Sequence, residues 1–138
     1  MHDLSRFHEA QAPVWPTALA ELKAGRKQSH WMWFVFPQIA GLGASPMAVH
    51  YAVRSADEAR AYLADPVLGA RLREGVAAVL GHRYLSAEAI FGGIDALKFR
   101  SSLTLFEAVA DAPAPFAAAL DAFYDGERDG RTLELLGR

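Results

Sequence analysis

The sequence predicts a mainly α-helical fold, formed as a single compact multihelical domain. Apolar residues recur at helical spacing through most of the chain, and cap and stop residues stand between these stretches. The length of 138 residues is typical of one domain, so we expect residues 1–138 to form it. The exception to this helical pattern is the segment at residues 30–37, which we expect to be a short irregular or extended aromatic segment.

Residues that favour helix ends predict the first two helices. Asp3 suits the cap of a first helix, because its carboxylate can accept a hydrogen bond from a free backbone amide. Pro16 suits the first turn of a second helix, and Gly25 suits its end. Leu19 and Leu22 give this second helix its apolar positions.

Residues 29–38, Ser-His-Trp-Met-Trp-Phe-Val-Phe-Pro-Gln, lean towards strand because they are rich in aromatic and branched side chains. Their apolar run is too short to distinguish a strand from a buried helical turn. No other stretch supplies partner strands of comparable quality. The segment is therefore compatible with a mainly helical fold in either form.

Two further helices follow a loop. Residues 55–58, Ser-Ala-Asp-Glu, have the pattern of a capping box, in which the serine oxygen meets a free amide and the glutamate reaches back. Asp65 and Pro66 suit the cap and the first residue of the next helix. That helix carries a continuous apolar stripe and ends at Gly81.

Four shorter or later helices complete the prediction. Ser86 opens a short helix that two glycines at 92–93 interrupt, and Asp95 suits the cap of the next one. An alanine-rich helix is expected over residues 113–124 and a last short one over 132–136. The apolar positions of the helix after Asp95 are Leu97, Phe99, Leu103, Phe106 and Val109.

The composition argues against several classes of function. The chain has no cysteine, which excludes disulfides, thiolate metal sites and a cysteine nucleophile. Its five histidines show no metal-binding spacing, so we expect no metal and no cofactor. The formal net charge is −2 and no basic stripe is present, so we expect no bulk nucleic-acid binding.

The sequence also predicts a cytoplasmic protein with no membrane association. Its first residues lack the apolar region of a signal peptide. The longest apolar run, Trp31 to Phe36, has six residues, whereas a membrane-spanning helix needs about 20.

The aromatic block, residues 29–38, supplies the first candidate site residues. His30 could bind a phosphate or a ribose hydroxyl, or act as an acid or base near neutral pH; a backbone carbonyl could equally satisfy it. Trp31 or Trp33 could stack on a base, while the alternative is that at least one packs in the core. Gln38 could orient a ribose or read a base edge, or belong to a turn.

The second candidate set is basic. Lys98, Arg100, Ser101 and Ser102 follow Asp95, so a helix capped at Asp95 places them in its first two turns. Free amides and the helix dipole favour an anion there. Lys98 with the two serines would then hold a phosphate or diphosphate. The alternative is a basic surface stripe with its serines in water.

Three further positions are candidates on weaker grounds. Asp129 lies in an Asp-Gly-Arg loop, where a carboxylate could activate water, although such triplets are common in turns. Arg26 and Lys27 stand just before the aromatic block and could assist the same anion, or be solvated.

The chain resembles the bacterial domain-of-unknown-function family 1810, whose members are often labelled calpastatin. That label does not fit the chain, because calpain inhibitors of that name are long, disordered and polar, whereas 52% of these residues are hydrophobic. The stretches that carry the resemblance are residues 25–38, 41–43, 62–63, 66–69, 90–92 and 98–106, with Tyr51.

A more distant resemblance is to the NADAR family of helical N-glycosidases, which act on ADP-ribosylated guanine and riboflavin-pathway intermediates. His50-Tyr51 stands where that family has Glu-His-Tyr, but Val49 replaces the acidic residue. Leu68-Gly69, Lys98-Phe99 and residues 130–137 follow in a similar order. The resemblance implies ligand binding at Tyr51 and hydrolysis of an N-glycosidic bond.

Two hypotheses follow. The first is a metal-independent N-glycosidase, in which a tryptophan stacks the base and Lys98 with its serines holds phosphate. In this hypothesis His30 or Asp129 transfers the proton or activates the water, and Gln38 orients the ribose. The second is a non-catalytic module that binds a ligand or a protein segment in the same aromatic and basic cleft. The expected partner is a nucleotide-like small molecule, and no protein partner can be named.

Overall fold

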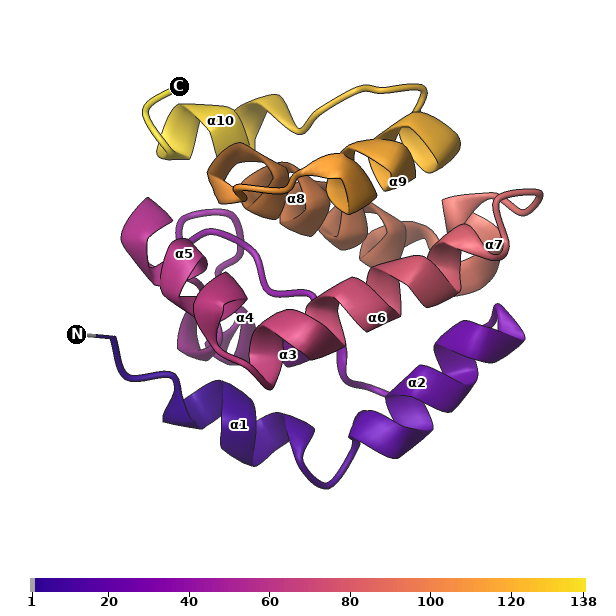
Figure 1. Cartoon of the computed structure of the whole chain (residues 1–138), viewed down its shortest axis with the longest axis horizontal. Helices are drawn as coiled ribbons and strands as arrows, with labels where there is room; N and C mark the ends of the chain where they lie inside the picture. The colour runs from indigo at the N-terminus through magenta and orange to yellow at the C-terminus, as the bar shows by residue number, and fades with distance from the viewer. Residues whose placement is uncertain (1) are drawn as a thin grey trace.

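Ten helices make up the regular structure of residues 2–138, the part of the chain that the computed structural model describes (Figure 1). Within these residues no strand forms, and Ile39 and Val53 make one isolated parallel bridge. The predicted mainly α-helical class is confirmed. The helices are α1 (Ser5–Gln11), α2 (Trp15–Ala24), α3 (Met32–Val35), α4 (Pro46–His50), α5 (Ala56–Ala64), α6 (Leu68–Leu80), α7 (Ala87–Phe91), α8 (Gly93–Val109), α9 (Ala114–Tyr124) and α10 (Gly130–Leu135).

Helix α8 is the longest helix and lies at the centre of the packing. It contacts α5, α7, α9 and α10, while α6 packs against α2, α5 and α9. In Figure 1 the C-terminal helices α9 and α10 lie at the top beside α8, and α1 and α2 lie at the bottom. Buried apolar side chains from nearly all of these elements form one continuous core. Helix α8 is therefore the central element on which a site can be built.

Several predicted helix ends are confirmed, but Leu4 and not Asp3 is the cap of α1, and α6 begins at Leu68 and not at Pro66. Gly25 ends α2 in the left-handed conformation, with φ of 75°. Ser55 caps α5, because its hydroxyl accepts a hydrogen bond from the Glu58 amide at 3.0 Å. Glu58 also reaches back as expected, but its carboxylate accepts from the amide of Arg54, the residue before the cap, and it pairs with Arg6. Glu58 therefore ties α5 to α1 as well as capping its own helix.

The start of α8 differs from the prediction. Ser86 caps α7 as expected, and Gly92 separates the two helices with φ of 85°, a conformation that other residues rarely adopt. Because this glycine turns the chain, α8 already begins at Gly93. Asp95 is therefore in the first turn of α8 and is not its cap.

The aromatic block folds as a short buried helix with irregular flanks. Helix α3 occupies its middle, and Met32, Phe34, Val35 and Phe36 are buried. The helical-turn alternative is thus the correct one for these residues. Beyond Pro37 the chain is extended only far enough for the bridge between Ile39 and Val53.

Helix α4 was not expected from the sequence. Its cap is Ser45, whose hydroxyl accepts a hydrogen bond from the Ala48 amide at 3.2 Å, and Pro46 is in its first turn. Serine followed by proline is a recognisable helix start. The helix was missed because only five residues follow, with no apolar stripe of their own.

Candidate functional site

One cavity of about 400 Å³ brings together four residues that the sequence singles out: Gln38, Lys98, Ser101 and Asp129. We call it the α4–α8 pocket. One wall is formed by residues 42–45 and Ala48 of α4. The other wall is the exposed side of α8, and Asp129 closes one end from the loop before α10. Segments about ninety residues apart in sequence therefore converge on one hollow.

Asp129 is held firmly at the end of the pocket. Its Oδ2 accepts hydrogen bonds from the hydroxyls of Ser101 at 2.8 Å and Thr132 at 2.5 Å. Its backbone amide donates to the Thr104 hydroxyl at 3.0 Å. Its Oδ1 lies 3.8 Å from the guanidinium of Arg100, which is beyond hydrogen-bonding distance.

These contacts set the charge of Asp129. Burial raises the pKa of its carboxyl, but the hydrogen bonds from Thr132 and Ser101 and the charge of Arg100 outweigh it and lower that pKa. The group is ionised at neutral pH. Such a carboxylate can accept hydrogen bonds from ligand hydroxyls or stabilise positive charge, and it is poorly suited to donating a proton.

Lys98 supplies the cation of the pocket. Its Nζ lies 3.6 Å from Oδ1 of Asp95 and 5.3 Å from the centre of the Trp33 ring. Lys98 on α8 and one tryptophan of the aromatic block are thus in contact, but Trp33 is not among the residues that line the pocket. Trp33 itself is half-buried beside Lys98.

The expected phosphate cradle at a helix start is not formed. Because α8 begins at Gly93, Lys98 lies in its second turn and Ser101 and Ser102 lie in the third, away from the free amides of the first turn. Ser101 instead donates to Asp129. Ser102 is buried, and within residues 2–138 its hydroxyl has no hydrogen-bond partner.

The rim of the pocket is aliphatic. Ile94 is 74% exposed and Leu97 is 61% exposed, although both line the pocket from α8. The helical spacing predicted an apolar position at Leu97, but the side chain is at the surface. Small-molecule sites typically combine apolar side chains with a few polar groups. Sequence reasoning did not identify this rim, because exposure depends on which face of α8 the other helices cover.

Trp31 has a structural role in the conformation described. It is 1% exposed, and its indole nitrogen donates to Glu21 Oε1 at 3.0 Å. Glu21 also accepts from the Ser29 hydroxyl at 2.6 Å and from the amides of Gln28 and Ser29. Burial raises the pKa of Glu21, but these four bonds outweigh it and lower that pKa to about 2. The start of the aromatic block is therefore fastened to α2, and Trp31 has no open face for a ligand ring.

The structure does not bring the remaining predicted residues to the pocket. His30 is exposed on the loop before α3. Tyr51 packs against Phe34, with ring centres 5.2 Å apart, and against His50. Within the described chain, neither His30, Tyr51 nor Ser102 is among the residues that line the α4–α8 pocket.

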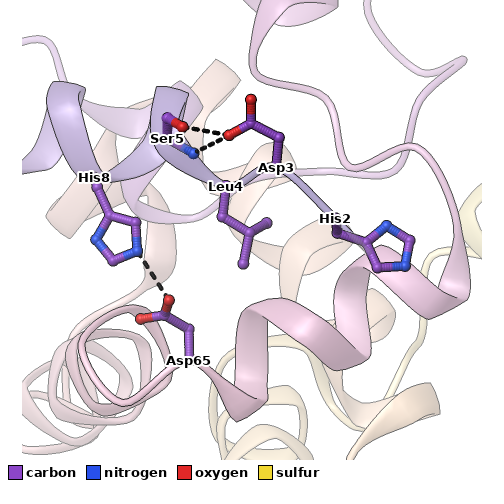
Figure 2. Close-up of a pocket in the computed structure, with 6 residues that line it drawn as sticks. All are labelled: His2, Asp3, Leu4, Ser5, His8 and Asp65. Carbon is purple, nitrogen blue, oxygen red and sulfur yellow. Dashed lines mark hydrogen bonds and ion pairs between the residues drawn. The ribbon is translucent and has the colours of Figure 1, made fainter.

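A second hollow of about 500 Å³ lies at the N-terminal end (Figure 2). Two histidines line it, and one of them pairs with a carboxylate: His8 Nε2 is 2.9 Å from Asp65 Oδ2. Figure 2 shows the Ser5 hydroxyl bonded to Asp3 instead of His8, so a Ser-His-Asp relay is not assembled. The other oxygen of Asp65 caps α6 through the Val67 and Leu68 amides. These groups serve the docking of α1.

Two further features of the structure bear on other functions. Among residues 2–138, no cluster of three or more histidines, aspartates and glutamates is placed to hold a metal ion. In the same part of the chain, none of the helices has the length and apolar character needed to cross a membrane.

Comparison with known proteins identifies similar chains. The model of the family described as protein of unknown function (DUF1810) matches residues 1–136. The crystal structure of the conserved hypothetical protein Rv1873 from Mycobacterium tuberculosis superimposes with a TM-score of 0.96. That protein is 51% identical, and the match covers 99% of this chain and 97% of the other. None of the curated proteins matches.

Proposed function

The chain belongs to the DUF1810 family of proteins of unknown function, and we propose that its α4–α8 pocket binds a nucleotide-like small molecule such as ADP-ribose. One observation carries the proposal: an ionised carboxylate, an ammonium group, a side-chain amide and an aliphatic rim surround a single cavity of about 400 Å³. Small-molecule sites typically combine apolar walls with a few polar groups that orient the ligand.

Each group has a role in this proposal. Lys98 holds a phosphate, Asp129 accepts hydrogen bonds from ribose hydroxyls through Oδ1, and Gln38 completes the ribose or base contacts. Ile94 and Leu97 cover one face of the base, a task that the sequence suggested for a tryptophan. Trp33 keeps the Lys98 ammonium beside the pocket through its ring face.

Hydrolysis of an N-glycosidic bond is the second candidate, and Asp129 is the observation that favours it. An ionised carboxylate in the pocket would stabilise the positive charge that develops on the sugar as the bond breaks. Val49, which replaces the acidic residue of the NADAR pattern, is 60% exposed on α4. Because this acidic residue is missing, we rank binding ahead of catalysis. In the catalytic candidate, His30 or Asp129 would handle the proton or the water.

Calorimetric titration with ADP-ribose tests the binding proposal. Asp129→Asn and Lys98→Met should each weaken binding at least about ten-fold, which corresponds to roughly 1.4 kcal/mol. Asp111→Asn and Lys23→Met make the same chemical changes at exposed positions outside the pocket, and they should bind like the wild type. Equal affinities for the pocket and control variants would refute the proposal.

The hydrolysis candidate needs its own assay. Purified protein is incubated with ADP-ribosylated guanosine and with riboflavin-pathway intermediates, and the release of the free base is followed. Release that Asp129→Asn abolishes would support an N-glycosidase. Binding of ADP-ribose without any release would support the non-catalytic module instead.

A further inference from the structure

We propose that Lys27, which is not in contact with the pocket, is a positioning residue that keeps the Lys98 ammonium available for an anionic ligand group. The inference rests on the proposed function only for the identity of the ligand. Its geometric basis is a single carboxylate, that of Asp95, shared by two ammonium groups of unequal exposure.

The two pairings of Asp95 differ in distance and burial. Nζ of Lys27 is 2.9 Å from Oδ2, and its side chain is 8% exposed. Nζ of Lys98 is 3.6 Å from Oδ1, and its side chain is 24% exposed. A buried ammonium requires a counter-charge far more than a partly solvated one does. Asp95 is therefore committed mainly to Lys27.

The surroundings of Lys27 fix it in this place. Its Nζ lies 5.2 Å from the centre of the Trp31 ring, and its backbone amide donates to the Ile90 carbonyl at 2.8 Å. Trp31 is itself anchored by Glu21. The two tryptophans of the aromatic block thus each lie beside one of the two lysines, Trp31 beside Lys27 and Trp33 beside Lys98.

The charges of this group do not cancel. Two ammonium groups and one carboxylate leave one positive charge in excess, and Lys98 is the member that lines the pocket. A phosphate in the pocket would meet an ammonium whose carboxylate is already engaged at shorter distance by Lys27. The part of the ligand that these three charged side chains would bind is therefore an anionic phosphate.

Removal of either partner should have opposite effects on that anion. Without Lys27, the Asp95 carboxylate would pair fully with Lys98 and compete with a bound phosphate. Without the Asp95 charge, Lys98 would have no competing carboxylate, and phosphate should bind more tightly. A purely structural role for the pair predicts loss of binding in both cases.

The lysine content makes the test direct, because the chain has three lysines, Lys23, Lys27 and Lys98. Protein labelled with ¹³C at the lysine ε carbon would show three signals, assigned with methionine variants at each position. The Lys98 signal is followed during titration with inorganic phosphate and, separately, with ADP-ribose. The variants are Lys27→Met, Asp95→Asn and the double variant, with Lys23→Met as the control for loss of one surface charge.

The two single variants should change the affinity for phosphate in opposite directions. We expect Lys27→Met to weaken phosphate binding about five-fold and Asp95→Asn to tighten it about three-fold, as expected for charges a few ångströms apart near a surface. The double variant, which leaves neither charge of the pair buried alone, should return close to the wild type. Lys23→Met should leave the affinity unchanged.

Contrary results separate the two proposals. If Lys27→Met and Asp95→Asn change phosphate affinity in the same direction, or if phosphate leaves the wild-type Lys98 signal unmoved, the role of Lys27 is refuted. If the phosphate pattern holds while ADP-ribose does not bind, Lys27 positions Lys98 as proposed and the nucleotide-like ligand is wrong.

Discussion

Trp31 donates its indole N–H to Glu21 at 3.0 Å, so the most distinctive aromatic residue of the chain serves as an anchor between the aromatic block and α2. Four donors converge on the Glu21 carboxylate, from residues 28, 29 and 31. This relationship places Trp31 in the core and leaves Trp33 as the tryptophan beside the α4–α8 pocket.

Glu21→Gln should destabilise the protein by about 2 kcal/mol at pH 7, because an amide cannot accept all four bonds and one of its N–H groups faces donors. The folded-state pKa of Glu21 is about 2, below the ordinary value of 4.5. The stabilisation is therefore complete above about pH 4.5 and is lost as the pH falls towards 2. Denaturant unfolding at several pH values should show the difference from wild type shrinking in acid. Glu9→Gln, at an exposed position, is the control, and a difference independent of pH would contradict this account.

Ser101→Ala and Thr132→Val should each raise the pKa of Asp129, because each removes a hydrogen bond to the ionised form. Carboxyl-carbon NMR titration measures this pKa directly. Since the wild-type pKa is lowered, the bonds stabilise the protein above pH 4 and progressively less below it. Thr17→Val, on the exposed side of α2, should leave the Asp129 titration unchanged. An unchanged pKa in both pocket variants would show that the two hydroxyls do not hold the charge.

Gly25→Ala and Gly93→Ala should change stability in opposite directions. Gly25 has φ of 75°, and an added Cβ would lie 2.9 Å from Nδ1 of His82, so we expect a loss of about 1–2 kcal/mol. Gly93 is helical and an added Cβ would meet open space, so alanine should stabilise by about 0.5 kcal/mol. Thermal unfolding of both variants checks this pair. A stabilising Gly25→Ala would mean that α2 does not end as described.

Leu97→Ser should weaken ADP-ribose binding several-fold while changing the free energy of unfolding by less than about 0.5 kcal/mol, because the side chain is mostly exposed and lines the pocket. Val67→Ser makes a similar change at an exposed position just before α6, outside the pocket, and should affect neither property. Equal affinities of the two variants for ADP-ribose would show that the aliphatic rim does not contact the ligand.

The parts of the fold that could be predicted are those encoded by neighbouring residues. Gly25 and Ser86 mark helix ends through their own backbone and side chain, and both predictions are confirmed. The mainly helical class follows from many such local signals. The start of α8 was misplaced because Asp95 resembles a cap, whereas the conformation of Gly92 decides where the helix begins.

The site could be predicted only in part, because it depends on contacts between distant segments. The sequence indicates Lys98 as part of a basic set and Asp129 as a loop carboxylate, but their sharing of one cavity follows from the packing of α10 against α8. The role of Glu21 could not be predicted, because nothing near it in sequence shows that residues 28–31 fold back against it. The exposure of Ile94 likewise depends on which face of α8 the other helices leave uncovered.

A crystal structure of the protein soaked with ADP-ribose tests the central claim most directly. The account predicts electron density in the α4–α8 pocket, with a phosphate beside Nζ of Lys98 and a ribose hydroxyl on Oδ1 of Asp129. Density for the ligand at another position, or an empty pocket at a concentration that saturates binding in solution, would contradict it.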